Sequence, residues 1–555
     1  MSAIQIDKLR LASRIVPSFG ETMALGTIGA VSAALVALFL VREQGVVGAL
    51  GMPLDDAWIH FNIARNLATG QGFSYNPGEP TSASTSPLWT ALLALFYLAT
   101  GQFVVPAVVL GVFFYLACNV AVYYVTLSMK SDRKLALVAA VFVAVTGRWV
   151  WASFSGMETT LFTALTMWGL LLFTRPGLRR TPTLALGSIL LALAALARPG
   201  GFVLLGMVIG WSVLSLLVQP GFFSHRPVLL HLCKPKTILP IMALIGALVV
   251  RLAYTVSTGG GVFGNTFMAQ SLPQGAGPYT GPRLFPDLWY LRNAVQSLRT
   301  DDFLLGLLIP VGVVLWIRLA RHNRSVRSLA ALSLLWFVAL PLFNSMVAPN
   351  LRHHERYLMP LIPWAILFGT FGISALVELT VGGWWRRRIP WVRFQVSAGI
   401  LFALVTAVTL GDALLDATRW ASQYAGDVRS IQRVQVEMGR WIRDNTPPSA
   451  YIALNDIGAI TFISNRRVLD TVGIAEAGIL PYLAEDGRQG VFEYLRQKRP
   501  DYLVVWPEWY PEMAAMADIF TPIHSIEVGD WPGATRQPMQ GGDVMVVYKA
   551  RWPER

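Results

Sequence analysis

Residues 22–41 read TMALGTIGAVSAALVALFLV, and residues 54–61, which follow after a short gap, read LDDAWIHF. The first stretch is apolar over about the 20 residues that a helix needs to cross a bilayer. Lys8, Arg10 and Arg14 precede it, and it lacks a clear small-x-small cleavage site. We therefore expect an uncleaved first span with its N-terminus in the cytoplasm. The second stretch places two carboxylates just beyond the end of that span.

Further apolar blocks of similar length follow along the chain. Of its 555 residues, 54% are apolar and only 14% are charged, against roughly 25% charged residues in soluble domains. This pattern predicts a polytopic α-helical membrane protein rather than a large soluble core. We expect about eleven spans, at residues 22–41, 104–127, 135–152, 158–174, 183–197, 201–218, 238–254, 303–318, 328–346, 357–379 and 395–416.

The placement of basic residues supports this set of spans. The loops predicted to be cytoplasmic are rich in Lys and Arg, whereas the short outer loops hold only scattered ones. This bias is typical of membrane proteins, whose cytoplasmic loops are positive. It accounts for the net charge of +13 and argues against nucleic acid as a partner, because nucleic-acid binding favours a basic stripe on one folded face. We expect a multi-pass protein of the cytoplasmic membrane.

One apolar stretch, 88–99, is too short for a span, and counting it would place the basic loops outside. We expect it to be an interfacial or re-entrant helix within a long outer loop, 42–103. The odd number of spans then divides the chain into a transmembrane module, 1–416, and an extracytoplasmic α/β domain, 417–555. Strands and helices are expected to alternate in this domain, with strands at 451–454, 467–472 and 501–506 and helices at 428–444 and 490–498.

The first outer loop contains the richest group of polar residues. Asp55 and Asp56 are adjacent, so they repel each other, and at least one is expected to have a raised pKa. Either could deprotonate a hydroxyl or hold a divalent cation; the alternative is that they cap the helix that begins there. We expect Asp55 to be the base and Asp56 the cap, because Asp55 precedes the helical run. His60 and Arg65 follow on the same predicted helix as candidate substrate contacts.

Basic residues also occur on the outer side, where they are otherwise scarce. Arg198 begins the sequence RPGG between two apolar blocks, and Arg356 lies in RHHERY. We expect both to bind a lipid phosphate, with His354 as a donor and Tyr357 as a neighbouring substrate contact. The alternatives are an arginine that reaches back to the interface, a loop that faces lipid headgroups, and metal ligation by the two adjacent histidines.

Glu158 and Asn265 complete the candidate site. Glu158 lies at the outer mouth of a predicted span, where it could contact substrate or cap the helix. Asn265 opens the largest later outer loop, where it could hydrogen-bond a sugar or form a turn. The sequence leaves the presence of a metal undecided.

In their order along the chain, these motifs resemble the GT-C superfamily of polyprenyl-phosphate-sugar glycosyltransferases. The chain is most similar to the branch with the mycobacterial terminal arabinofuranosyltransferase. The likeness rests on DDAWIHFNIARNLATGQGFSYNPGE and TSPLW in the first loop, then on SGMET at 155–159, LARP at 196–199, NTF at 265–267 and RYLMP at 356–360, with a weaker continuation in NDIG at 455–458 and at Asp470. One departure is Gln270, where relatives often have a lysine; a lysine contact to phosphate is absent there.

The resemblance implies a GT-C fold with an outward-facing active site, in which a first-loop carboxylate is the catalytic candidate. It implies an inverting transferase that moves a monosaccharide, with arabinofuranose as one candidate, from a polyprenyl-phosphate donor. The acceptor would be a hydroxyl of a glycan, glycolipid or protein, and membrane lipid is the further partner. No cofactor is assigned, although a divalent cation could take part. The alternatives are a transporter or flippase of lipid-linked sugars, disfavoured by the lack of repeats, and a non-catalytic cell-envelope assembly protein.

Overall fold

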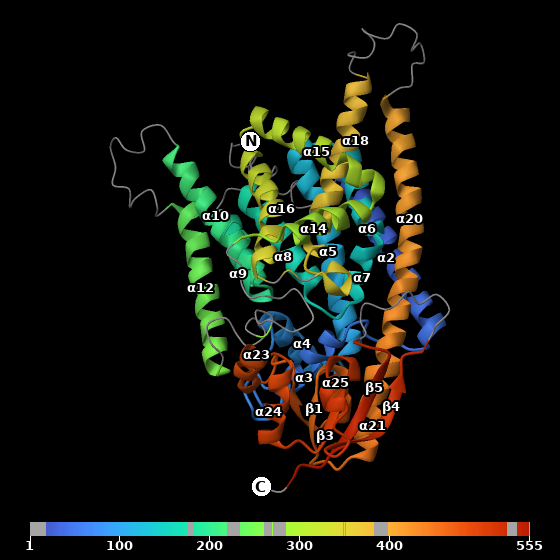
Figure 1. Ribbon diagram of the computed structural model, residues 1–555. Helices are drawn as coiled ribbons and strands as arrows, with labels where there is room; N and C mark the ends of the chain where they lie inside the picture. Colours follow the sequence, from blue (N-terminus) through green and yellow to red (C-terminus); the bar gives the residue numbers. More distant parts are fainter. Residues whose placement is uncertain are drawn as a thin grey trace.

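The protein consists of a bundle of apolar helices with a five-stranded sheet at one end (Figure 1). The computed structural model describes residues 18–175, 181–218, 234–259, 269, 285–347, 349, 351–381, 398–529 and 541–553. Asn265 and Gln270 therefore lie outside the described residues. The fold class expected from the sequence, a polytopic helical membrane protein with a C-terminal α/β region, is confirmed.

Eight described helical segments are long and apolar enough to cross a membrane, or nine if one bent pair counts as a single span. The bent pair is α6 (Arg133–Val145) with α7 (Gly147–Phe154), at 59°. The shorter apolar helices α8 (Thr159–Thr174) and α9 (Thr181–Ala197) fall at two further expected spans. The long helices are α2 (Phe19–Val47), α5 (Val104–Lys130), α10 (Gly200–Leu217), α12 (Pro235–Ser257), α15 (Phe303–His322), α16 (Arg327–Val347), α18 (Ile362–Val381) and α20 (Ala398–Ile431). Each expected span thus contains a helix. Eight or nine of the described segments are long enough to cross a membrane.

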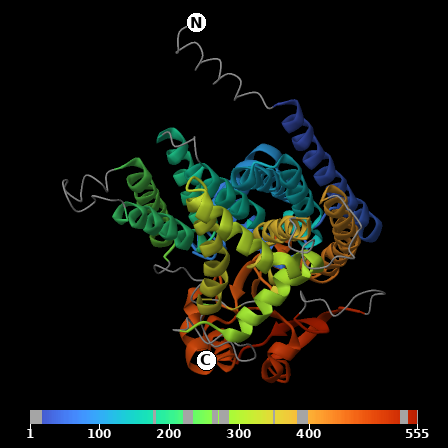
Figure 2. The same ribbon diagram turned by 90° about the horizontal axis from the view of Figure 1, so that it is seen from above.

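The outward faces of these helices are apolar. Large hydrophobic side chains remain exposed along them, such as Val109, Leu248, Val314 and Leu404. A soluble protein would rarely leave so many exposed, whereas hydrocarbon lipid tails cover such faces without loss. Seen from above, α2 and α20 lie side by side on one side of the bundle, and α10 and α12 lie on another (Figure 2).

Two short helices of the first loop lie between the bundle and the sheet (Figure 1). They are α3 (Asp55–Ala68) and α4 (Pro87–Thr100). Pro87 occupies the first turn of α4, and Gly101 ends it in the left-handed conformation, which are the favoured residues at those positions. The C-terminal end of α18 and the start of α20, which flank an arginine-rich loop in the sequence, lie at the opposite end of the bundle.

The sheet has the strand order β2-β1-β3-β5-β4. β1 pairs in parallel with β2 and β3, and β5 pairs antiparallel with β3 and β4. The strands are β1 (Tyr451–Leu454), β2 (Arg467–Asp470), β3 (Tyr502–Val505), β4 (Phe520–Glu527) and β5 (Val544–Ala550). The helices between or before them are α21 (Glu437–Asn445), α22 (Ala459–Ser464), α23 (Leu480–Asp486), α24 (Gln489–Lys498) and α25 (Pro511–Ala514). The sequence predicts the first three strands but not β4 and β5.

The bundle and the sheet are joined both by the chain and by a shared core. The expected boundary between residues 416 and 417 lies inside α20, which continues through a short π-helix, Gln432–Val436, into α21. Ile59 and Ile63 of α3 belong to the same buried cluster as Ile452 and Leu454 of β1. The first loop therefore packs against the C-terminal sheet as closely as against the bundle.

Candidate active site

The first carboxylate of α3 binds the C-terminal region. The two oxygens of Asp55 accept hydrogen bonds from the backbone N–H groups of Gly458, at 2.8 Å, and Ala459, at 2.7 Å. Burial and the nearby charge of Asp456 raise the pKa of Asp55 to about 8, although the two N–H donors act in the opposite direction. Asp55 thus bonds the N-terminus of another helix, α22, which differs from the capping of α3 that the sequence analysis assigns to Asp56.

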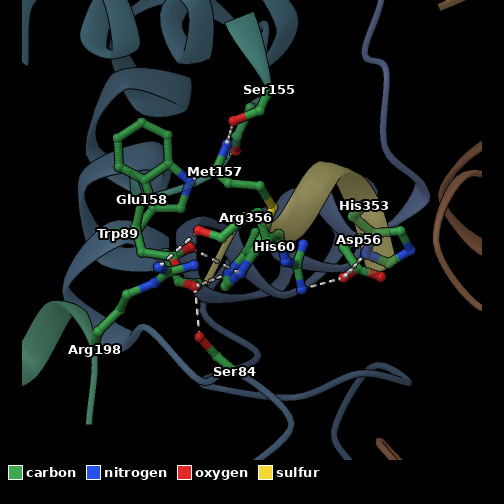
Figure 3. A network of polar contacts seen from close by, with 12 residues as sticks. Asp56, His60, Ser84, Trp89, Ser155, Met157, Glu158, Arg198, His353 and Arg356 are labelled. Atoms are coloured by element: carbon green, nitrogen blue, oxygen red, sulfur yellow. Dashed lines mark hydrogen bonds and ion pairs between the residues drawn. The ribbon is translucent and has the colours of Figure 1, made fainter. Parts of the chain in front are cut away.

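The second carboxylate points into a buried group of charged side chains (Figure 3). Asp56 Oδ2 forms an ion pair with Arg356 Nη2 at 2.5 Å, and His353 Nδ1 lies 3.9 Å from the same oxygen. Burial acts to raise the pKa of Asp56, but the charge of Arg356 outweighs it and holds that pKa below its usual value. The Asp56 side chain remains 30% exposed, so a substrate can reach it.

A second ion pair lies beside the first. Arg198, at the junction of α9 and α10, donates from Nε to Glu158 Oε1 at 2.6 Å. Arg198 is only 8% exposed and Glu158 2%. Burial acts to raise the pKa of Glu158, but the charge of Arg198 outweighs it and holds that pKa below its usual value. The Arg198 guanidinium also lies 5.2 Å from the centre of the Tyr357 ring, and Arg356 lies 5.1 Å from the same ring.

His60 connects these pairs to the first loop. Its Nδ1 lies 2.9 Å from the Thr90 hydroxyl, which contacts the Ser84 hydroxyl at 2.8 Å. Its Nε2 lies 3.9 Å from Glu158 Oε2. Burial lowers the pKa of His60 despite the nearby carboxylates, so the ring is neutral at neutral pH. A neutral imidazole leaves the group with two arginines opposed by two carboxylates.

Several buried polar atoms of this group have no hydrogen-bond partner among the described residues. They are Arg356 Nε and Nη1, His353 Nδ1 and Glu158 Oε2. Arg356 is 7% exposed, so leaving two guanidinium donors unpaired there is costly. Each unpaired guanidinium donor can bond an oxygen of an anion such as a phosphate.

An unusual turn presents Arg356 to the site. His353, His354 and Glu355 all have left-handed φ values, of 56°, 56° and 50°, which are unfavourable for residues with a Cβ. Glu355 is held by Arg148 of α7 at 2.7 Å. The partner of His354 is Asp427 of α20, and the two side chains lie 2.8 Å apart.

The candidates from the sequence therefore fall into two groups. Asp56, His60, Glu158, Arg198, Arg356 and Tyr357 lie together. Asp55 and Arg65 lie at the seam with the C-terminal region, where Arg65 donates to the carbonyl of Phe462 at 3.1 Å. His354 packs between Trp151 and Trp420 and is bonded to Asp427 rather than aimed at Arg356. Asn265 lies outside the described residues.

The sequence analysis did not select Thr90 or Asp427, and it considered His353 only as a possible metal ligand beside His354. His353 is adjacent to His354 in RHHERY, and only the backbone turn decides which of the two faces Asp56. Thr90 lies in the predicted interfacial helix, one turn after Ser86, and carries no charge that marks it. Asp427 belongs to the extended end of α20, where a buried acid has no signal in the local sequence.

Two cavities lie along the seam, apart from the charged group. One is about 260 Å³ and is lined by Asn76, Glu79, Asp470 and Glu476 among others; the other is about 240 Å³ and includes Arg65. The part of the chain that the structure describes contains no group of three or more His, Cys, Asp or Glu side chains placed to hold a metal ion.

Comparison with known proteins supports the fold. A family described as a domain of unknown function (DUF8728) matches residues 425–548, and no curated protein matches the chain. The oligosaccharyltransferase AglB of Archaeoglobus fulgidus, solved with an inhibitory peptide and a dolichol-phosphate, is 13% identical with a TM-score of 0.57, over 90% of this chain and 71% of that one. ArnT of Cupriavidus metallidurans, solved with undecaprenyl phosphate, is 13% identical with a TM-score of 0.57, over 94% and 98%.

These likenesses show that the chain shares the fold of these two proteins. At 13% identity they show the fold alone. The arabinosyltransferase EmbB of Mycobacterium smegmatis is 12% identical over 91% of this chain and 45% of that one, with a TM-score of 0.35. That score is too low to favour the arabinofuranosyltransferase branch over any other.

Proposed function

We propose that the protein is an inverting glycosyltransferase that moves a monosaccharide from a polyprenyl-phosphate donor to a hydroxyl of a glycan, glycolipid or protein. The observation that carries this proposal is the pairing of the accessible Asp56 with the buried Arg356, beside the buried pair of Glu158 and Arg198, at the end of the bundle that faces the sheet. Carboxylates and arginines held together in this way supply a proton acceptor and a phosphate site within one group.

The donor phosphate would bind Arg356 and Arg198. The two unpaired donors of Arg356 would bond phosphate oxygens, and Arg198, whose Nε is taken by Glu158, would contribute charge from the other side of Tyr357. In the transition state the bond between the anomeric carbon and the phosphate oxygen breaks, so negative charge grows on the leaving phosphate. Fixed guanidinium groups stabilise that charge without reorganisation.

Asp56 would be the base. A pKa near the working pH favours a proton acceptor, and on that ground alone Asp55, at about 8, would be preferred. Geometry nevertheless favours Asp56 as the base. Both oxygens of Asp55 are bonded to backbone N–H groups, whereas the Asp56 carboxylate is accessible to a substrate. When a donor phosphate draws Arg356 toward itself, Asp56 loses part of its partner and gains a negative neighbour. Both changes raise its pKa, so donor binding would prepare the base.

The neighbouring structures are consistent with this donor class, since one was solved with a dolichol-phosphate and another with undecaprenyl phosphate. We extend the proposal to arabinofuranose as one candidate sugar, which rests on the sequence motifs alone. The acceptor class remains any exposed sugar or protein hydroxyl that can reach Asp56.

The test replaces the base. Asp56→Asn keeps the shape of the side chain and removes its basicity, so transfer from radiolabelled short-chain polyprenyl-phosphate monosaccharides to membranes of the native host should fall about 10²-fold. Donor binding should persist, because the lost interaction belongs to the transition state. Asp444→Asn, at an exposed ion pair with Arg443, is the matched control. Full activity of Asp56→Asn would reject the proposed mechanism.

A further inference from the structure

We infer that Gly458 and Ala459 of the C-terminal region support the catalytic site by holding Asp55, a positioning residue that fixes the direction of Asp56. This inference rests on the proposed function. It gives a role to the region that matches a domain of unknown function, residues 425–548. The partner of Asp55 is not a side chain but the backbone of Gly458 and Ala459. These two residues lie where the loop after strand β1 leads into α22.

Hydrogen bonds fix the orientation of Asp55 at this contact. Each oxygen of Asp55 accepts one N–H, from residues 403 and 404 positions further along the chain. Two hydrogen bonds from rigid backbone groups, one to each oxygen, hold the Asp55 carboxyl group in a single orientation. The rest of the first loop is bound to the same region. The Tyr75 hydroxyl donates to the carbonyl of Ile457, and Asn76 bonds both the N–H and the carbonyl of Val468, each at 2.9 Å.

Packing also holds α3 against the C-terminal region. The apolar face of α3 contributes Ile59 and Ile63 to a buried cluster that also contains Ile452, Leu454 and Ile457. The ring of Phe462 on α22 lies 5.3 Å from that of Trp58. α3 is thus clamped along its length by the C-terminal region, and Asp55 is the contact at the end nearest the charged group.

The backbones of Gly458 and Asp55 approach each other closely. A Cβ at Gly458 would lie 2.1 Å from the backbone oxygen of Asp55 and 2.5 Å from its carboxylate. No side chain fits there unless α3 and the segment that carries Gly458 move apart. Because Asp55 and Asp56 are consecutive on one helix, about 100° apart, any shift of the first carries the second away from Arg356. A displacement of about 1 Å at a reacting group can lower a rate about 10²-fold.

The test introduces this clash between residue 458 and Asp55 into the full-length protein. Gly458→Ala should lower kcat by about 10- to 100-fold while the binding constant for a polyprenyl-phosphate monosaccharide, measured by displacement of a fluorescent polyprenyl phosphate, stays within about twofold. Gly490→Ala is the matched control: its Cβ would lie 2.2 Å from the backbone oxygen of Tyr482, an equal clash that lies inside the C-terminal region and does not touch α3. It should leave kcat unchanged.

A second variant tests the same inference without a clash. Asp55→Asn keeps the volume of the side chain but turns one acceptor into a donor that faces an N–H, so it should also lower kcat without weakening donor binding. Wild-type kcat in both Gly458→Ala and Asp55→Asn, with Asp56→Asn inactive, would overturn the inference and leave the proposed function intact. Equal losses of kcat in Gly458→Ala and Gly490→Ala would also overturn it. Full activity of Asp56→Asn would instead reject the proposed function itself.

Discussion

At the scale of single residues, Arg198 and Arg356 differ in how their charge is balanced. Arg356 pairs with the reachable Asp56 and retains two unpaired donors, whereas Arg198 pairs with a buried Glu158. Arg356→Ala should therefore weaken donor binding by roughly the 2–5 kcal/mol that follows truncation of a buried charge pair. Arg356→Lys should restore only part of it, since lysine lacks the planar fork. Titration of the purified protein with a polyprenyl-phosphate monosaccharide measures both, and unchanged affinity in the alanine variant would contradict the phosphate site.

Arg198 requires a different design, because its removal leaves Glu158 charged and buried. Arg198→Ala should lower both stability and donor affinity. The double variant Arg198→Ala with Glu158→Gln removes both charges, so it should regain thermal stability but not donor affinity. Thermal unfolding and donor binding, measured on the same preparations, separate the two effects. Recovery of donor affinity in the double variant would show that Arg198 serves only to neutralise Glu158.

The pH dependence of activity follows from Asp56. Its pKa is held below the usual value, so the carboxylate needed for proton transfer is present at neutral pH and is lost only as pH falls through that lowered pKa. The acid limb of kcat/KM should therefore lie below about pH 4, the ordinary aspartate value. Arg356→Gln removes the main opposing charge and should move the limb to higher pH, while Arg356→Lys should not. A limb at the same pH in both variants would assign it to another group.

Single residues also show which parts of the candidate site the sequence can predict. The sequence selects six members of the charged group because each is a charged, aromatic or imidazole residue at a predicted outer surface. It does not predict the partner of Asp55, because that partner is a backbone N–H 403 residues away. No local sequence pattern predicts this contact, because it forms only when the C-terminal sheet packs against the first loop.

At the scale of elements, the left-handed turn at residues 353–355 is held by tertiary contacts. Three such residues in a row cost roughly 1–2 kcal/mol each, and nothing in HHE offers a glycine or asparagine to relieve that cost. The bond from His354 to Asp427 and the ion pair from Glu355 to Arg148 hold the turn in place. Apolar periodicity predicts helices well, since burial against neighbours is what forms them. It cannot predict a turn that its neighbours impose.

This turn leads to a prediction about His354. His354→Ala removes the bond to Asp427 and should lower donor affinity, because Arg356 is carried by the same turn. His354→Asn should restore part of the affinity, since asparagine tolerates the left-handed conformation and can still donate to Asp427. Donor binding and thermal unfolding of both variants test this. Wild-type affinity in His354→Ala would show that the turn does not depend on this bond.

At the scale of the whole molecule, the arrangement of the two ends predicts the topology. α3, the charged group and the sheet share one end of the bundle, and the C-terminal end of α18 and the start of α20, which flank an arginine-rich stretch of the sequence, lie at the other (Figure 1). Cytoplasmic loops are the positive ones, so we expect the sheet outside the cytoplasm and the α15–α16 connection inside. The chain has only two cysteines, Cys118 and Cys233, which can be replaced to give a background for single-cysteine labelling.

The expected outcome is a difference between two exposed positions in that background. Glu485→Cys on α23 should react with a membrane-impermeant maleimide in intact cells, and Asn323→Cys, between α15 and α16, should react only after the membrane is opened. Both side chains are exposed, so accessibility from one side of the membrane is what distinguishes them. The reverse pattern would place the candidate site in the cytoplasm. It would then separate Asp56 from a donor in the outer leaflet and remove the basis for the proposed reaction on that face.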